Sequence, residues 1–110
     1  MTDAAPPPVC LILVTAPPDA AERIAEAALV ARVVACANIL PGVSSRYWWK
    51  EALEWSSECL ILFKTTRDRV PAAIDVIDAA HPYDVPEILA VGVDAGLPAY
   101  LAWVAESVRR

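Results

Sequence analysis

The sequence predicts an α+β fold in which short strands and amphipathic helices alternate along a single domain. Apolar or β-branched runs of strand length occur at residues 9–16, 33–40, 58–66 and 87–94. Between them, apolar residues recur at helical spacing, and proline or glycine separates successive stretches. A chain of 110 residues has room for one domain. We expect residues 1–8, which end in three prolines, to form a disordered tail before a single domain at residues 9–110.

The first half of the chain is expected to supply a strand, a helix and a long second strand. Asp19 stands three residues before Glu22, a capping-box pattern, so the helix should begin after Asp19 as its N-cap. A Pro-Gly pair follows the strand at residues 33–40 and should break or bend it before the chain resumes at residues 43–49. A hairpin turn is expected near Glu51, and its geometry stays open.

The second half of the chain combines a fully apolar strand with two more helices. Residues 59–63 are apolar at every position, which is typical of a strand that is buried on both faces. A helix to about residue 80 is predicted by apolar residues at i, i+3, i+4 and i+7, namely Val70, Ala73, Ile74 and Ile77. A last helix follows Gly96 and has its own apolar stripe at Leu97, Tyr100, Leu101, Val104 and Val108.

The resulting order is strand, helix, strand, strand, helix, strand and C-terminal helix, which is the ferredoxin-like split βαβ arrangement. Both crossover helices should then lie on the same face of the sheet. The other face would be bare, although the central strand is apolar on both sides. A second copy of the same sheet is the simplest cover, so the sequence predicts a homo-oligomer.

Composition and charge exclude several classes of protein. The chain is 57% hydrophobic with a mean hydropathy of +0.43, yet no apolar run approaches the roughly 20 residues that span a bilayer. The net charge of −5 disfavours nucleic acid as a partner. The N-terminus lacks the basic and apolar regions of a signal peptide, so we expect a cytoplasmic protein. The three cysteines form no disulfide framework or CxxC site and are expected to be free thiols.

Several motifs, spread in a fixed order through the chain, together resemble a known family. They are Thr15-Ala16-Pro17, residues 35–43, Ser45, Tyr47 and Trp49, Lys64-Thr65, His81-Pro82-Tyr83, Pro86-Glu87-Ile88, and Tyr100-Leu101 with Trp103. In these residues, which extend over about positions 9 to 106, the chain is similar to the CutA divalent-cation tolerance proteins.

The resemblance implies a ferredoxin-like subunit in a compact, PII-like homotrimer, a cytoplasmic setting, and a role in tolerance or binding of divalent metals, copper especially. It implies no required cofactor beyond a possible copper or other divalent metal ion. Kinship with PII-like proteins leaves one alternative open, a regulatory module that binds a small anionic metabolite between subunits. An enzyme that uses His81 as an acid–base group is least favoured, because the sequence has no phosphate-cradling or nucleophile motif.

His81 is the candidate metal ligand. Some family members are thought to hold copper through a cysteine before Thr-Ala-Pro and two histidines before Pro-Tyr. In this chain those positions are Val14, Ala80 and His81, so one of three matches. Asp84 and Glu87 could add oxygen ligands, although specific sites need three or four convergent ligands. The alternative is that the His81 ring caps the preceding helix by bonding its last carbonyls.

An aromatic run at Tyr47, Trp48 and Trp49 is the candidate trimer interface. Strand alternation places Tyr47 and Trp49 on one face and Trp48 on the other. We expect these rings to pack onto a neighbouring subunit, with a ligand-stacking platform as the alternative. The role of Trp55 stays open.

Lys64 ends an otherwise apolar strand, so it should pair with a carboxylate such as Glu58 or Glu87 across a subunit boundary, or with an anionic ligand. A candidate ligand pocket combines these features, and it consists of Cys36, Lys64, Tyr83, Asp84 and Glu87 beside His81.

Overall fold

The computed structural model describes residues 7–109, so most of the predicted tail lies outside the described residues. Their elements run in the order β1 (Val9–Ala16), α1 (Ala21–Val30), β2 (Cys36–Trp49), β3 (Ala52–Thr66), the 3-10 turn η1 (Arg67–Arg69), α2 (Val70–Ala80), β4 (Ile88–Gly92) and α3 (Pro98–Ser107). This confirms the predicted βαββαβ order with a C-terminal helix. None of the helices in that part of the chain is long and apolar enough to cross a membrane.

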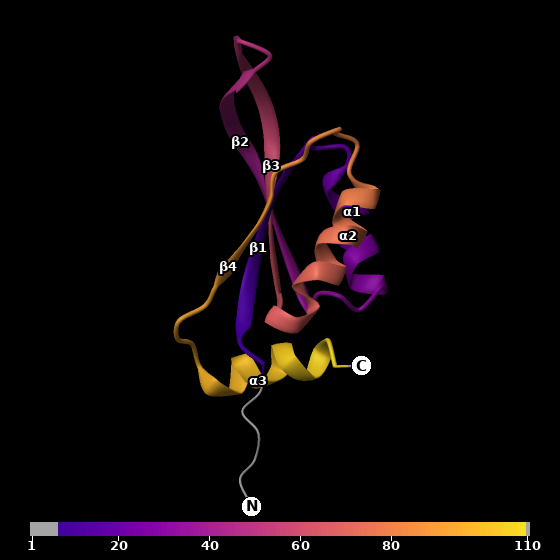
Figure 1. Ribbon diagram of the computed structural model, residues 1–110, viewed down its shortest axis with the longest axis vertical. Coiled ribbons are helices and arrows are strands. Elements are labelled where there is room, and N and C mark those ends of the chain that lie inside the picture. The colour runs from indigo at the N-terminus through magenta and orange to yellow at the C-terminus, as the bar shows by residue number, and fades with distance from the viewer. Residues whose placement is uncertain (1–6, 110) are drawn as a thin grey trace, which may run out of the picture.

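The core lies between one face of the sheet and two helices. The strands are antiparallel in the order β2-β3-β1-β4, and α1 and α2 lie together on one side of them (Figure 1). Ile12 of β1 stands opposite Phe63 of β3, and both side chains are fully buried. Ile24 of α1 and Ile77 of α2 belong to the same buried cluster. The prediction that both crossover helices share one face is therefore confirmed.

The opposite face of the sheet is only partly covered within one chain. Leu60 and Leu62 alternate with the buried residues of β3 and are half-buried, while Leu89 and Val91 of β4 are exposed. The α3 helix crosses one end of the sheet (Figure 1), close to the thiol of Cys36, which is a neighbour of Tyr100. The strand that was predicted to be buried on both faces is thus buried on one face in the single chain. We call the half-covered side the open face.

The β2 strand bends at Pro41 and Gly42 and does not break there, which confirms one of the two predicted outcomes, but it begins at Cys36 rather than at residue 33. The chain continues through a β-bulge between Leu40 and Val43, where Gly42 takes a φ of 76° that favours glycine. The β3 strand also begins at Ala52 rather than residue 58. The two strands together form a hairpin that projects well beyond the rest of the sheet (Figure 1). We call this extension the hairpin arm, residues 43–58.

A two-residue turn closes the hairpin arm. Trp49 pairs with Ala52, and the two residues between them, Lys50 and Glu51, have φ values of 50° and 65°. Left-handed geometry at both central residues is the type I′ pattern, which matches the twist of the flanking strands and favours glycine at the second position. The sequence left the geometry of this turn open. It is a two-residue turn, and both of its central positions hold residues other than glycine.

Replacing Glu51 with glycine should stabilise the protein. A residue with a Cβ pays roughly 1–2 kcal/mol in the left-handed region, and glycine avoids most of this cost. We expect Glu51→Gly to raise the free energy of unfolding by up to about 1 kcal/mol in chemical denaturation. Ala52→Gly is the control, since glycine inside a strand weakens it. Equal losses of stability in both variants would contradict the assigned turn.

The start of α1 differs from its prediction. Asp19 was expected to cap the helix, but Ala20 occupies the N-cap position and makes no side-chain capping bond. The physical reason is a preceding turn, in which the Ala20 N–H donates to the Pro17 carbonyl at 3.0 Å. That turn places Asp19 ahead of the helix, so its carboxylate does not reach the free N–H groups of the first helical turn.

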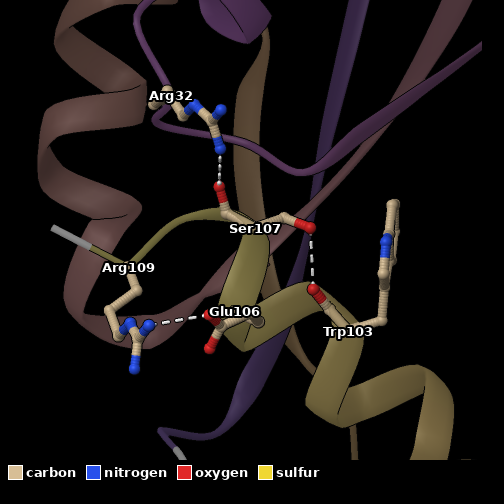
Figure 2. Close-up of polar contacts among 5 residues, drawn as sticks. All are labelled: Arg32, Trp103, Glu106, Ser107 and Arg109. Carbon is tan, nitrogen blue, oxygen red and sulfur yellow. Dashed lines mark hydrogen bonds and ion pairs between the residues drawn. The ribbon is translucent and has the colours of Figure 1, made fainter.

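The end of α1 is closed by a Schellman motif centred on Arg32. Arg32 has a φ of 60°; its N–H donates to Leu29 O, and the N–H of Val33 donates to Ala28 O. The Arg32 guanidinium also donates to the Ser107 carbonyl at the end of α3, at 3.1 Å (Figure 2). The backbone carbonyl of Arg32 accepts a hydrogen bond from Arg69 Nη2 of η1 at 3.2 Å. One residue thus ties together the ends of α1 and α3 and the turn η1.

Candidate functional site

A groove of about 800 Å³ runs along the hairpin arm and reaches its base. Its walls come from β1, the hairpin arm and the loop that follows α2. The lining residues are Thr15, residues 44–49, Glu54, Glu58, residues 82–85 and Glu87. Sequence-distant segments therefore meet here, and a volume of this size is in the range of small-molecule sites, about 300–1,000 Å³.

The loop at residues 81–87 is positioned by its prolines and by His81. Pro82 and Pro86 prevent helix continuation, and the backbone at His81 is extended. The His81 N–H donates to Asp78 O at 3.2 Å, so the backbone and not the ring closes α2. The alternative in which the His81 ring caps the helix is therefore wrong.

Both ring nitrogens of His81 are occupied within the chain. The side chain is 8% exposed, and Nδ1 accepts a hydrogen bond from the Tyr83 N–H at 3.2 Å. Nε2 lies 2.8 Å from the Thr15 carbonyl, and it must carry the proton because Nδ1 is the acceptor. The ring therefore holds the loop against β1, and a metal could bind only after one of these two bonds opens.

Glu58 is a buried carboxylate beneath this loop. It is 5% exposed, and its Oε2 accepts a hydrogen bond from the Tyr83 hydroxyl at 2.9 Å. The Tyr83 ring lies against His81, with ring centres 4.8 Å apart. Burial, then the hydrogen bond to Glu58 and its charge, raise the pKa of Tyr83 to about 12. The pair thus favours the neutral phenol of Tyr83 as the donor to Glu58.

Alkaline pH should weaken the protein through Tyr83. Its folded pKa of about 12 lies above the ordinary value of 10.0, so the phenol stabilises the fold fully below pH 10 and loses this contribution as pH rises through about 12. We expect Tyr83→Phe to lose less stability than the parent over this window, measured by urea unfolding at several pH values. Parallel losses in the two proteins would show that the Tyr83 hydroxyl does not contribute.

The structure divides the sequence-predicted site residues into two groups. Tyr83, Asp84 and Glu87 line the groove together with Tyr47, Trp48 and Trp49, and His81 lies directly behind Tyr83. Cys36 and Lys64 are not brought to it. Lys64 lies six residues from Glu58 along β3, roughly 20 Å at about 3.3 Å per residue, so the two cannot pair within one chain.

Cys36 and Lys64 form a separate cluster at the other end of the open face. They are register partners in the sheet. The Lys64 ammonium donates to Asn38 Oδ1, which the Cys36 thiol also approaches at 3.7 Å. The polar partner of Lys64 within the chain is therefore an amide oxygen and not Glu58 or Glu87.

The two other positions for which the resemblance implied metal ligands, residues 14 and 80, belong to the packed interior. Val14 is fully buried in the core, and Ala80 packs against it. In the described part of the chain, no group of three or more His, Cys, Asp or Glu side chains is placed to hold a metal ion. His81 is thus without the convergent partners that a complete site in one chain requires.

The groove carries an excess of negative charge. Among the lining residues that the structure describes, four are carboxylates, namely Glu54, Glu58, Asp84 and Glu87, and one, Arg46, is a cation. Glu58 was not in the predicted pocket, although a lone carboxylate directly before the apolar residues 59–63 was a signal that could have found it. The groove therefore favours cations over anions.

The two faces of the hairpin arm differ in their exposed aromatic residues. The Trp48–Leu53 pair and Trp55 share one face, and the Trp55 indole donates to Ser44 Oγ at 2.7 Å. Tyr47 and Trp49 share the other face, where the Tyr47 hydroxyl bonds Ser56 Oγ at 2.6 Å. All of these rings are substantially exposed in the single chain. Trp55, whose role the sequence left open, thus adds to an exposed apolar strip.

Comparison with known proteins gives one consistent family. The model of the CutA1 divalent ion tolerance protein family matches residues 10–107. The divalent-cation tolerance protein CutA of Pectobacterium atrosepticum is 41% identical over 106 residues, which cover 93% of this chain and 96% of the relative. Protein CutA of Mus musculus is 40% identical over 100 residues, and there the match covers 90% of this chain but 56% of the relative.

Solved structures agree with this match. CutA1 from Oryza sativa superposes with a TM-score of 0.91 at 34% identity, covering 96% of this chain and 98% of that one. CutA from Xylella fastidiosa superposes with a TM-score of 0.88 at 40% identity, covering 91% and 97%. The similarity therefore extends over the whole sheet and its helices.

Proposed function

Because this chain belongs to the CutA1 divalent ion tolerance protein family, we propose that it acts in tolerance of divalent metal ions, copper in particular, as a PII-like homotrimer in the cytoplasm. The family is named for tolerance of cations and not for an enzymatic reaction. The observation that carries the proposal is the charge of the groove, whose described lining residues include four carboxylates and one guanidinium.

The charge of the groove separates the metal role from its main alternative. A PII-like module that binds an anionic metabolite would need several cations at the site, and Arg46 alone supplies one among the described lining residues. Lys64 is too distant to help and already donates to Asn38. Attraction of a divalent cation is thus better supported than binding of an anion.

The trimer is supported by apolar surface that one chain leaves uncovered. Leu60 and Leu62 on the open face, and Tyr47, Trp48 and Trp49 on the hairpin arm, would lose contact with water in such an assembly. Removal of apolar surface from water contributes roughly 25 cal/mol per Å², from which the entropy cost of association is subtracted. The cytoplasmic setting is supported by three free cysteines, because reducing compartments keep thiols unpaired.

Copper binding in this chain should be weak and should depend on His81. Imidazole suits copper, and Asp84 and Glu87 lie on the same loop. Val14 and Ala80 supply no donor, and a bound ion must displace one of the two hydrogen bonds of the His81 ring. We therefore propose His81 as a single protein anchor, with water or a second chain completing the coordination sphere.

Copper titration by calorimetry tests this role. We expect His81→Ala to weaken copper binding at least several-fold, while Asp75→Ala on the exposed face of α2 leaves it unchanged. His81→Gln serves as a second variant, since its amide nitrogen is as many bonds from Cβ as the imidazole Nε2 and can still donate to the Thr15 carbonyl. If the parent and both His81 variants give the same isotherm, His81 has a structural role alone.

A further inference from the structure

We propose that the loop at residues 82–86 is a gate over His81, and that Tyr83 holds this gate shut through its bond to Glu58. In the closed state the loop occupies the ring nitrogen through which His81 would receive a metal ion. The gate rests on the proposed function, because His81 is the anchor that it controls, and it adds regulation of access to that anchor. Three features support it: the attachment of the loop at its ends, its one contact between them, and the roles of the two ring nitrogens.

Both ends of the loop are attached to neighbouring residues of β1. Before the loop, the His81 ring bonds the Thr15 carbonyl at 2.8 Å. After it, Ile88 is the register partner of Val14 in the pairing of β1 with β4. The β1 strand lies between β3 and β4 in the sheet, so both anchors are held by an interior strand. The segment between them can therefore swing outward without separation of the strands.

Between its ends, the loop is fastened to the sheet by one side chain. Residues 82–85 are exposed. Among the residues that the structure describes, Tyr83 alone forms hydrogen bonds from this loop: its N–H donates to His81 Nδ1 at 3.2 Å, and its hydroxyl donates to Glu58 Oε2 at 2.9 Å. Because Glu58 belongs to β3 and is buried, the phenol ties the loop to the sheet. Segments with so few buried contacts open at low free energy in native proteins.

The two ring nitrogens of His81 respond differently when the loop opens. Nε2–H donates to a carbonyl of β1, which does not move with the loop. Nδ1 accepts the N–H of Tyr83, which belongs to the loop and leaves with it. Opening therefore frees the lone pair of Nδ1, while the bond at Nε2 keeps the ring oriented, as it does in many metal-binding histidines. The ring thus offers Nδ1 to a metal ion in the open state and not in the closed one.

The population of the open state then sets the metal affinity. For a ligand that binds only the open form, the apparent dissociation constant equals the intrinsic value divided by the open fraction. The bond between Tyr83 and Glu58 exists only in the closed form and lowers that fraction. Its loss should raise the open fraction roughly five- to tenfold, the scale of one hydrogen bond. Amide exchange at residue 83 and the copper affinity should rise by the same factor, since both are proportional to the open fraction.

The test compares Tyr83→Phe with the parent in two measurements on the intact protein. Native-state hydrogen exchange gives the protection factor of the amide of residue 83, and calorimetric titration with copper gives the affinity. We expect this amide to be protected in the parent, and Tyr83→Phe to lower its protection and raise the copper affinity, each roughly five- to tenfold. Adding His81→Ala should remove the gain in affinity. Tyr47→Phe is the matched control and should change neither quantity, because the Tyr47 hydroxyl bonds Ser56 within the hairpin arm.

Three results would overturn the gate. They are an unprotected amide at residue 83 in the parent, equal protection of this amide in the parent and Tyr83→Phe, and copper binding that stays the same or weakens in Tyr83→Phe although exchange has become faster. Identical copper isotherms for the parent and His81→Ala would instead reject the metal role of His81, and the exchange data would then decide alone whether Tyr83 holds the loop shut. Failure of the gate thereby stays distinguishable from failure of the proposed function.

Discussion

If the proposed homotrimer forms, replacing Trp49 with alanine is expected to abolish it and not to release a stable monomer. The Trp49 ring is 44% exposed in a single chain and shares its strand face with Tyr47. Burial against a neighbour would make its loss cost about 3–5 kcal/mol, as in a core, and a symmetric trimer contains three copies. Because obligate oligomers often lack a stable folded monomer, the melting temperature should fall sharply and depend on protein concentration.

Light scattering and thermal melting across a range of concentrations measure this effect. Val30→Ala, at an exposed position of α1 outside the proposed interface, is the control and should elute and melt like the parent. The rival view holds that the aromatic residues of the hairpin arm form a ligand platform. It predicts an unchanged mass and melting point in Trp49→Ala, with binding alone lost, and that outcome would reject the interface.

The second large effect is expected in the core, where Phe63→Ala should cost about 3–5 kcal/mol of unfolding free energy. Phe63 is fully buried against the helices, opposite Ile12. This loss occurs within each chain and does not require a partner. Denaturant unfolding with unchanged slope measures it. A loss below 1 kcal/mol would mean that the helix face of the sheet is packed differently.

Leu62, the residue next to Phe63, reports on the open face in the same experiment. It points to the other side of the sheet and is half-buried in one chain. If a second subunit covers that face in solution, Leu62→Ala should approach the 2–5 kcal/mol that is typical of a buried leucine. A small loss beside a large one for Phe63→Ala would mean that the open face stays in contact with water.

Periodicity was sufficient for the order of elements but not for their ends. The strand Val9–Ala16 has the predicted bounds, because its apolar run stops at two prolines. The first six residues of β3 were missed because neither face of the hairpin arm is buried there. Polar residues such as Glu54, Ser56 and Ser57 therefore replace the alternation of apolar and polar residues that marks a half-buried strand. The N-cap was misplaced because Asp19 belongs to a turn with Pro18 at its second position, which the capping-box pattern of Asp19 and Glu22 did not take into account.

The candidate site was predictable in its residues but not in their grouping. The sequence pointed to Tyr83, Asp84 and Glu87, and the structure places all three at the groove. Cys36 and Lys64 were assigned to the same pocket only because their side chains can bind ligands. The sheet register, which the sequence does not reveal, places them at the other end of β3. Glu58 acquires its role from Tyr83, twenty-five residues away, and only the folding of the proline-containing loop brings the two together.

The Arg32 contacts also bear on how the native protein opens locally. The side chain of Arg32, at the end of α1, donates to the Ser107 carbonyl at the end of α3 (Figure 2). The backbone carbonyl of Arg32 accepts a hydrogen bond from Arg69 of η1. Native proteins open locally in contiguous cooperative units, and we expect these linked segments to form one of them. The C-terminal helix should therefore not fray independently of α1, and detachment of α3 would free the left-handed Arg32 junction at the same time. Native-state hydrogen exchange would then group residues that are seventy-five positions apart in the chain.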